Sequence, residues 1–307
     1  MESISSSILH DLTCGPIRLA DRLTEIPLLG RARGPRLDLL HHAVAQGTAV
    51  VTEVDEKGVV GRLRVENRGD RPLLLIQGEE LRGAKQDRVI NRSLLLQPGT
   101  SAEVPVSCVE RGRWRRESQA MHSSGRTLPS TLRARLARRV LRNEARGLGS
   151  VSDQLTTWRE VDRFLETTHI HSDTSSIGAA LDDLLRGVHV ARALPPFDDQ
   201  VGGIYLRGRE LLGMERLGRP EAWQRGWQVI ARGHAVNPTP ARHRPNITLP
   251  LERDGALELL RGELNAARWW REREEDGLED LRFAGERVFG SALLVDGEPA
   301  HVAVWPC

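Results

Sequence analysis

Strand-like and helix-like patterns occupy separate stretches of this chain, and their order restricts the fold. Residues 48–54 and 59–66 are two strand-like runs on either side of the turn sequence Asp55-Glu56-Lys57-Gly58, which predicts a β-hairpin. Three further apolar runs continue the strand pattern, at residues 73–76, 89–96 and 103–109. The first third is therefore expected to form an antiparallel sheet or sandwich.

The middle of the chain has helical patterns. Residues 130–146 are rich in arginine and end at Gly147, which favours a helix that stops there. A second helix is expected to begin after Ser152 or Asp153 and to run to about residue 168, because both side chains are good N-caps. A third is expected between the capping residues 173–176 and residue 192.

Strand signals return in the second half and alternate with helical ones. Residues 201–206 read as a strand, and Pro220 fits the first turn of a helix. Residues 237–250 contain four prolines and predict a loop, and residues 254–275 predict a further helix. The turn Asp296-Gly297 between two apolar runs, 287–295 and 300–305, predicts a hairpin.

This order predicts an α+β protein rather than a regular alternation of strands and helices. We expect an antiparallel sheet or sandwich first, a central helical segment next, and mixed strands and helices in the second half. Residues 1–34 are expected to form an N-terminal segment before a domain at residues 35–305. That domain is expected to have two lobes, residues 35–192 and 193–307, although the last hairpin can complete a sheet with the other strands of the second half.

Composition excludes several classes of protein. At 307 residues, with 39% hydrophobic and 28% charged residues, the chain can form a sizeable core. A formal charge of +2 is too small for a general nucleic-acid binder. Three dispersed cysteines fit neither a disulfide framework nor a zinc ligand set, and no secretory signal or membrane span is apparent. We therefore expect a cytoplasmic protein without membrane partners, and we leave open whether it is a homo-oligomer.

One lysine stands out among the positive charges. Only two of the 44 basic residues are lysines, Lys57 and Lys85. Lys57 lies in the predicted turn, but Lys85 follows the sequence Gly78-Glu79-Glu80-Leu81-Arg82-Gly83-Ala84 at the end of a strand-like run. A lysine is a compact point charge with a tunable pKa, which a guanidinium is not. Lys85 is therefore either a functional group or a surface residue of a loop.

The residues around Lys85 provide candidates for binding and for catalysis. Arg88 and Arg113 can pair with phosphate, and Trp114 can stack on a base. Gln86 and Asn91 can bond a ribose or a base edge, or tie loops to the backbone. A general base, if this is an enzyme, is expected among the carboxylates Glu79, Glu80 and Glu110. In the structural alternative, Trp114 fills the core and Arg113 pairs with Glu110.

Other candidate sites have a simpler explanation. Cys108 lies in or just after an apolar strand without a nearby histidine, which is typical of a buried small hydrophobe. The sequence His169-Ile170-His171-Ser172-Asp173 has ligand spacing but also resembles a helix entry, so we predict no metal site. The arginine-rich helix has no aromatic residues for stacking on single strands, which argues against a nucleic-acid partner.

Taken together, these motifs resemble the bacterial ARPP-1 family, the ARG and rhodanese-phosphatase-superfamily-associated proteins. The resemblance covers about residues 35–305. Three sets of residues carry it: Gly78-Glu79-Glu80-Leu81 and Gly83-Ala84-Lys85-Gln86 with Arg88 and Asn91, the run Pro105-Val106-Ser107-Cys108-Val109-Glu110 with Gly112-Arg113-Trp114, and Gln200-Val201-Gly202. Asp87 stands where the family pattern has asparagine. The family name records an association with ADP-ribosylglycohydrolases, which implies a place in NAD or ADP-ribose metabolism but names no cofactor.

Three functions remain open from the sequence. The first is binding of an NAD-derived or ADP-ribose-like nucleotide metabolite, with Lys85, Arg88 and Arg113 facing phosphate and Trp114 or Asn91 facing the base or ribose. The second is a hydrolase that acts on such a metabolite. The third is a non-catalytic interaction or structural protein. The first two require the two signature segments to meet, which happens only if their strands pair.

Overall fold

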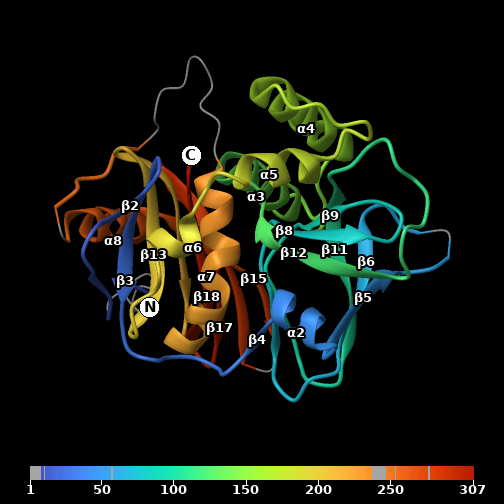
Figure 1. Ribbon diagram of the computed structural model, residues 1–307. Helices are drawn as coiled ribbons and strands as arrows, with labels where there is room; N and C mark the ends of the chain where they lie inside the picture. The colour runs from blue at the N-terminus through green and yellow to red at the C-terminus, as the bar shows by residue number, and fades with distance from the viewer. Residues whose placement is uncertain (1–7, 10, 57, 237–246, 253, 276) are drawn as a thin grey trace. The chain divides into compact units, whose positions relative to one another are not determined.

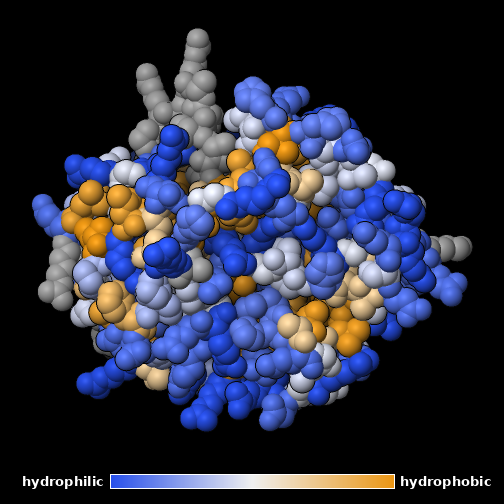
Figure 2. All heavy atoms as spheres, viewed as in Figure 1, coloured by the Kyte–Doolittle hydropathy of each residue, from blue (hydrophilic) through white to orange (hydrophobic). Residues whose placement is uncertain are grey.

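The computed structural model describes residues 8–9, 11–56, 58–236, 247–252, 254–275 and 277–307. The chain divides into two compact units. Unit 1 comprises Met1–Arg36, His189–Ala235 and Arg242–Cys307, and unit 2 comprises Leu37–Val188 and Val236–Ala241. The face of the molecule in Figure 2 is mostly hydrophilic, with hydrophobic residues in several separate patches. No helix in the described part of the chain is long and apolar enough to cross a membrane.

Unit 1 is built on a nine-stranded sheet in the order β1-β3-β13-β14-β18-β17-β16-β15, with β2 paired to β3. Every pair is antiparallel. The strands are β1 (Thr13–Cys14), β2 (Arg18–Ala20), β3 (Leu23–Leu29), β13 (Gln200–Arg207), β14 (Glu210–Leu217), β15 (Arg268–Glu275), β16 (Leu278–Ala284), β17 (Val288–Val295) and β18 (Glu298–Pro306). In Figure 1 the blue β3 lies beside the yellow β13, so strands from opposite ends of the sequence share this sheet.

Two helices pack on opposite faces of that sheet. Helix α8 (Gly255–Ala266) contributes Leu257 and Leu260 to a core that includes Ile204 of β13. Tyr205, the next residue along β13, stacks instead on His234 of α7 (Pro220–Ala235), with ring centroids 4.1 Å apart. Because successive side chains of a strand point to opposite faces, α7 and α8 cover different faces. A short helix, α6 (Val190–Ala193), precedes β13.

Most elements predicted for the second half of the sequence are present, but strands β14 and β16 were not predicted and one predicted helix is wrong in part. The strand at 201–206, the helix that begins at Pro220 and the hairpin at Asp296-Gly297 are confirmed. The predicted helix at 254–275 is wrong beyond Ala266, because Arg268–Glu275 is the edge strand β15 paired with β16. Aromatic residues favour strands, and Trp269 in β15 packs on Phe283 of β16 with ring centroids 4.5 Å apart. Most of the predicted loop at 237–250 lies outside the described residues.

Unit 2 contains a closed six-stranded barrel in the order β11-β6-β5-β12-β8-β9. Its antiparallel strands are β5 (Ala49–Glu53), β6 (Arg62–Asn67), β8 (Glu79–Gly83), β9 (Arg88–Ile90), β11 (Ser101–Cys108) and β12 (Ala120–Thr127). A small sheet of β10 (Leu94–Leu96), β7 (Leu73–Leu75) and β4 (Asp38–Leu39) accompanies it, with helix α2 (Leu40–Gln46). The predicted hairpin is confirmed as β5 and β6, and the predicted antiparallel sheet closes on itself.

Three helices lie beside the barrel in Figure 1: α3 (Ser130–Glu144), α4 (Gln154–Thr168) and α5 (Ile177–Leu185). The Asp153 carboxylate caps α4 and Ser176 caps α5, as the sequence indicated. The third predicted helix was expected to reach residue 192 but ends at Leu185, and Val190–Ala193 is the separate helix α6. The helices cover the outer face of the barrel through Val89 and Val109.

Strand alternation decides which side chains enter the barrel. Apolar residues of all six strands form its interior core, among them Val51, Leu63, Leu81, Ile90, Val106 and Met121. Glu53, Arg88 and Cys108 are each two positions from one of these residues on the same strand, so they point into the barrel as well. The register places all three at one end of the barrel, because Arg88 is opposite Cys108 and Glu53 is opposite Leu63.

We predicted a separate segment at residues 1–34 and two lobes that divide at residue 193. In the structure, β1, β2 and β3 within residues 13–29 are strands of the unit 1 sheet. The division between the two units falls between Val188 and His189, close to the predicted boundary. As expected for the last hairpin, β18 pairs with β14 and completes the sheet of the second-half strands.

Candidate functional site

The two signature segments of the sequence meet in unit 2. Strand β9 pairs with β8 on one side, where Arg88 is opposite Leu81, and with β11 on the other, where Arg88 is opposite Cys108. Lys85 follows β8 and Trp114 follows β11, so both belong to connections at the same end of the barrel. The pairing that the functional hypotheses required is therefore present.

A buried ion pair lies inside this end of the barrel. The Arg88 side chain is fully buried, and its Nη2 is 3.7 Å from Oε1 of Glu53, whose side chain is only 5% exposed. Nη1 of Arg88 donates to the backbone oxygen of Gln86 at 3.1 Å. Among the described residues, Nε and Nη2 of Arg88 and Oε2 of Glu53 have no hydrogen-bond partner. The two opposite charges are therefore close together, and each keeps atoms that could form a further hydrogen bond.

Trp114 and Lys85 lie next to that ion pair. The Trp114 side chain is large and apolar, yet 47% of the residue is exposed. Nζ of Lys85 is 5.5 Å from the centroid of its ring, and Cζ of Arg88 is 5.7 Å from it, so both cations are within cation–π range. Nζ of Lys85 also donates to the backbone oxygen of Glu56 at 2.6 Å. The alternative prediction, in which Trp114 fills the core, does not agree with this exposure.

Arg113 takes part in a dense network of carboxylates. Its guanidinium is 2.9 Å from Asp87 Oδ1 and 2.7 Å from Glu110 Oε2, and it donates to the backbone oxygen of Ala84. The pKa of Asp87 is raised to about 6, mainly by burial and then by the negative charge of Glu110. The Arg113 charge lowers it by a smaller amount. Burial alone would raise the pKa of Glu110 too, but hydrogen bonds from Arg113, Thr174 and the Asp87 N–H hold it below its usual range. These contacts fix the connection that carries Trp114.

Gln86 and Asn91 have protein partners of their own. The Gln86 amide donates weakly to the backbone oxygen of Arg111 at 3.4 Å. The Asn91 amide donates to the backbone oxygen of Ser150 at 3.1 Å and accepts from the Ser107 hydroxyl at 2.7 Å. Both residues are buried. Their contact with a ligand stays a prediction, and the hydrogen bonds that they make in the structure stabilise the neighbouring strands and connections.

The two adjacent glutamates of β8 point to opposite faces, as their spacing indicated. Glu80 faces the helices, where Arg126 Nε donates to it at 2.8 Å and Arg82 Nε is 3.4 Å away. Glu79 points into the barrel and accepts from the Ser123 hydroxyl at 2.7 Å. Burial raises the pKa of Glu79 to about 7, against smaller opposing effects of Ser123 and Arg133. Glu79 begins β8, so it lies toward the opposite end of the strand from Lys85.

Cys108 is not an activated nucleophile in this setting. It is buried in the barrel, and its thiol donates to the backbone oxygen of Val60 at 3.5 Å. Burial raises the pKa of the Cys108 thiol to about 11, and the Arg88 charge lowers it by less. The thiolate is the reactive form, so a thiol with this pKa is unreactive near neutral pH.

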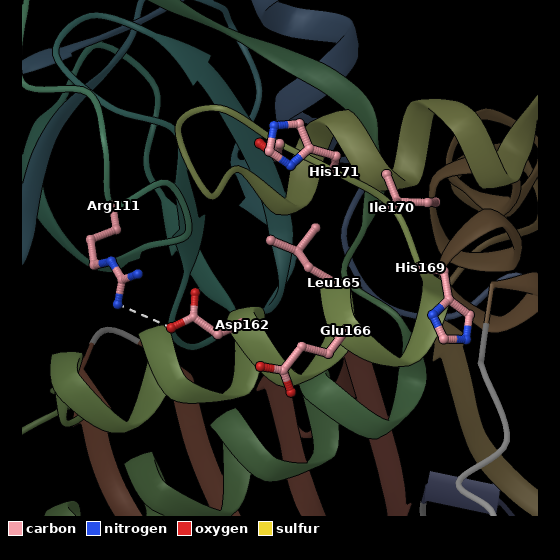
Figure 3. A pocket seen from close by; sticks show the side chains of 8 residues that line it. Arg111, Asp162, Leu165, Glu166, His169, Ile170 and His171 are labelled. Atoms are coloured by element: carbon pink, nitrogen blue, oxygen red, sulfur yellow. Dashed lines mark hydrogen bonds and ion pairs between the residues drawn. The ribbon is translucent and has the colours of Figure 1, made fainter.

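The histidine cluster lines a separate, shallow cavity of about 680 Å³ with Arg111, Asp162 and Glu166. Figure 3 shows His169 and His171 on either side of Ile170, and Arg111 bonded to Asp162. His169 ends α4 in a left-handed conformation, and His171 bonds Asp173 at 3.0 Å, with both side chains exposed. Within the described residues, no group of three or more His, Cys, Asp or Glu side chains is arranged to hold a metal ion.

The family model of ARPP-1, the ARG and Rhodanese-Phosphatase-superfamily-associated Protein domain, matches residues 11–305. The chain belongs to the ARPP-1 family. No curated protein and no solved structure matches it. The match begins before the residues on which the sequence resemblance rested, and the β1–β3 strands it adds belong to the unit 1 sheet.

The third set of residues on which the sequence resemblance rested lies in unit 1. Gln200 of β13 is fully buried in unit 1, where its amide donates to Glu25 Oε1 at 3.1 Å and to the backbone oxygen of Gly202 at 2.9 Å. Burial raises the pKa of Glu25 despite the nearby Arg18. Gly202 has no room for a side chain, since a Cβ there would lie 2.5 Å from the backbone oxygen of Glu215. The contacts of this motif are with the unit 1 sheet.

Sequence reasoning missed Glu53, although a signal for it was present. The predicted strand 48–54 places Glu53 on the same face as Ala49 and Val51, both of which are buried in the barrel. A carboxylate that falls on the apolar face of a strand is an anomaly of the alternating pattern. Its partner, Arg88, is also on an inward-facing position. In the sequence, this site can be recognised by two residues of opposite charge at inward-facing positions of two predicted strands.

Proposed function

We propose that unit 2 binds an NAD-derived or ADP-ribose-like nucleotide metabolite at the barrel end formed by Lys85, Arg88 and Trp114. One observation carries the proposal: a half-exposed indole has two cations within 6 Å of its ring. An exposed tryptophan offers a stacking face to a base or pyridine ring. Lysine is a common point-charge partner of phosphate, and Lys85 lies at the partly exposed margin of this face.

The family membership supports the same class of ligand. The family name associates ARPP-1 proteins with ARG proteins, and the resemblance implies a place in NAD or ADP-ribose metabolism. In this proposal Arg113 mainly fixes the connection that presents Trp114, through Glu110 and Asp87. Gln86 and Asn91 hold neighbouring backbone.

We also infer a cytoplasmic location from the three free cysteines, because free thiols are typical of a reducing compartment. Fractionation of cells that express the tagged protein would test this location.

The test is calorimetric titration of the purified protein with ADP-ribose and with NAD. Lys85→Ala should weaken binding by about tenfold or more, because a charged hydrogen bond to phosphate contributes about 1.5–3 kcal/mol. Trp114→Ala should weaken it to a similar extent, and Trp114→Phe should weaken it less because an aromatic face remains. Arg116→Ala is the matched control, since this exposed cation lies on the same connection. Unchanged affinity in Lys85→Ala and Trp114→Ala would exclude this site.

Thermal unfolding of the same variants separates binding from a structural role. Nζ of Lys85 makes an exposed hydrogen bond, so Lys85→Ala should keep a melting temperature near that of the wild type. Arg113→Ala leaves Asp87 and Glu110 without their buried cation, which should cost about 3–5 kcal/mol of stability. If neither variant affects any ligand and both unfold more easily, the interaction or structural hypothesis is favoured.

A second candidate function is hydrolysis of such a metabolite, and Glu79 is the residue that supports it. Its raised pKa of about 7 is suited to a general base at neutral pH, and its Oε2 has no hydrogen-bond partner among the described residues. Glu110, with its lowered pKa, and Glu80, held by two arginines, are weaker candidates. Chromatography of NAD and ADP-ribose after incubation with the protein should show products that are lost in Glu79→Gln. Absence of turnover with the wild type rejects this function.

A further inference from the structure

Two charged side chains at the barrel end keep hydrogen-bonding atoms unused although they are buried. Nε and Nη2 of the Arg88 guanidinium donate to no described residue, and Oε2 of Glu53 accepts from none. The Arg88 residue is fully buried, and the Glu53 side chain is 5% exposed. Buried polar groups in native proteins are nearly always hydrogen-bonded, and an unmade bond costs free energy. Such a pair of groups is complementary to a bound molecule.

The neighbouring groups are used elsewhere and do not satisfy these atoms. Nη2 of Arg88 is 3.7 Å from Oε1 of Glu53, which is too long for a hydrogen bond. The backbone N–H of Lys85 reaches Oε1 at 3.3 Å rather than Oε2. The Cys108 thiol donates to the backbone oxygen of Val60. The donor edge of Arg88 and the acceptor Oε2 of Glu53 therefore remain side by side.

We propose that Glu53 and Arg88 together recognise the edge of an aromatic ring that carries an amino group beside a hydrogen-bond acceptor. Oε2 of Glu53 accepts from the amino group, and the Arg88 guanidinium donates to the acceptor. Two ring systems of the proposed ligand class have this edge, the carboxamide of nicotinamide and the amino edge of adenine. This inference rests on the proposed function and deepens it, because it assigns Arg88 to the ring edge and leaves the phosphates to Lys85.

Trp114 connects the buried edge to the surface. Its ring is 5.7 Å from Cζ of Arg88 on one side and 47% of the residue is exposed on the other. It lies between β11 and β12, in a connection without regular secondary structure. For a ring to reach the ion pair, the indole must rotate away from Arg88, and it can then stack on the ring that enters. A ligand with a carboxylate at that edge should bind more weakly, because the oxygen that replaces the NH2 group offers Glu53 no donor and places a negative charge beside it.

The experiment compares ligands that differ only at this edge, using calorimetry on the full chain. Nicotinamide mononucleotide is paired with nicotinic acid mononucleotide, and AMP is paired with purine riboside 5′-monophosphate, which lacks the amino group. The wild type should prefer the amino-bearing member of at least one pair by about tenfold or more. A preference within the first pair identifies nicotinamide as the ring, and a preference within the second identifies adenine.

Glu53→Gln supplies the second measurement, since it removes the charge and keeps the shape. The preference should fall several-fold in Glu53→Gln, while Glu103→Gln, an exposed pair member on β11, should retain the wild-type preference. If the metabolites bind but the wild type shows no preference in either pair, or if Glu53→Gln keeps the full preference, this inference fails and the proposed function stands. If none of the four ligands binds at up to millimolar concentration while ADP-ribose or NAD does, this inference fails and the proposed function stands. If ADP-ribose and NAD do not bind either, both fail.

Discussion

Buried carboxyl groups of unit 2 differ in what surrounds them, and this difference sets their pKa values. Glu110 accepts hydrogen bonds from Arg113 and Thr174 and from a backbone N–H, so its pKa is lowered although it is buried. Glu79 accepts one side-chain hydrogen bond and is fully buried, so its pKa rises to about 7. The charged form of Glu110 is therefore stabilised by folding, and the protonated form of Glu79 is favoured by it.

Folding stability should depend on pH through Glu79. Its folded-state pKa of about 7 lies above the usual glutamate pKa of 4.5, so between these values the folded protein binds a proton that the unfolded chain releases. The contribution of Glu79 to stability is therefore greatest below pH 4.5 and is lost as the pH rises to about 7. Relative to Glu79→Gln, which does not titrate, the wild type should lose about 2–3 kcal/mol between pH 5 and pH 8.

Urea denaturation of both proteins at pH 5 and pH 8 measures this difference. The comparison with Glu79→Gln removes the contribution of Asp87, whose pKa of about 6 gives a pH dependence of the same sign in both proteins. Any constant effect of the amide on packing cancels between the two pH values. A stability difference that is the same at both pH values would show that Glu79 is charged at neutral pH in the folded protein.

At the scale of elements, one side chain ties helix α4 to the end of strand β11. Gln154, the first residue of α4, accepts from the backbone N–H of Cys108 at 2.9 Å and donates to its backbone oxygen at 2.8 Å. It therefore bonds the end of β11 as a neighbouring strand would. Asp153 caps the same helix and fixes its first turn. The helix start and the strand end are held as one assembly.

Loss of that connection should be measurable. Gln154→Ala leaves a buried N–H and a buried C=O of Cys108 without partners, which should destabilise the protein by about 2–4 kcal/mol. Leu155→Ala is the matched control, because Leu155 is the next residue of α4 and is 60% exposed. Its effect should stay within about 0.5 kcal/mol. Equal melting temperatures for the wild type and Gln154→Ala would show that water replaces the side chain.

Local signals predicted the elements wherever the deciding interactions are local. The Asp296-Gly297 turn adopts positive φ at both residues, 52° and 77°, so its two residues alone predict the hairpin. The Asp153 cap is equally local. The sequence predicts a helix over residues 268–275 because the strand preference of Trp269 and Trp270 is weak by itself, and the pairing with β16 that decides the structure involves residues outside the segment. Barrel closure was not predicted for the same reason, since it depends on pairings between strands that are distant in sequence.

The candidate site was predicted in part, for a related reason. Lys85, Arg88 and Trp114 were identified from residue type and context, and the structure brings them together. Glu53 was not identified, although its inward position was present in the strand pattern, because its pairing with Arg88 from another strand was not. Nor did the sequence separate Glu79 from Lys85, although β8, at about 3.3 Å per residue, places Glu79 at one end of the strand and the connection with Lys85 after the other. Residue type thus indicated candidates, and strand pairing selected which of them meet.

At the scale of the whole molecule, the chain consists of two units that are each held by a separate core. In sequence, residues 37–188, nearly all of unit 2, are inserted between segments of unit 1. The unit 1 sheet contains strands that come before and after this insertion in the chain. Leu81 belongs to the barrel core, and Leu257 belongs to the core between the unit 1 sheet and α8. Because no residue is shared between these two cores, a cavity in one should leave packing in the other intact.

Hydrogen exchange with mass spectrometry on two full-length variants tests this independence. Leu81→Ala and Leu257→Ala each remove a side chain that is at most 1% exposed, at a cost of about 2–5 kcal/mol. Leu81→Ala should accelerate exchange in the barrel strands of unit 2 and leave the unit 1 sheet protected, and Leu257→Ala should do the reverse. Each variant thus serves as the control for the other. Faster exchange throughout the chain in both variants would instead show that the units unfold as one cooperative structure, because opening either core then exposes the amides of both.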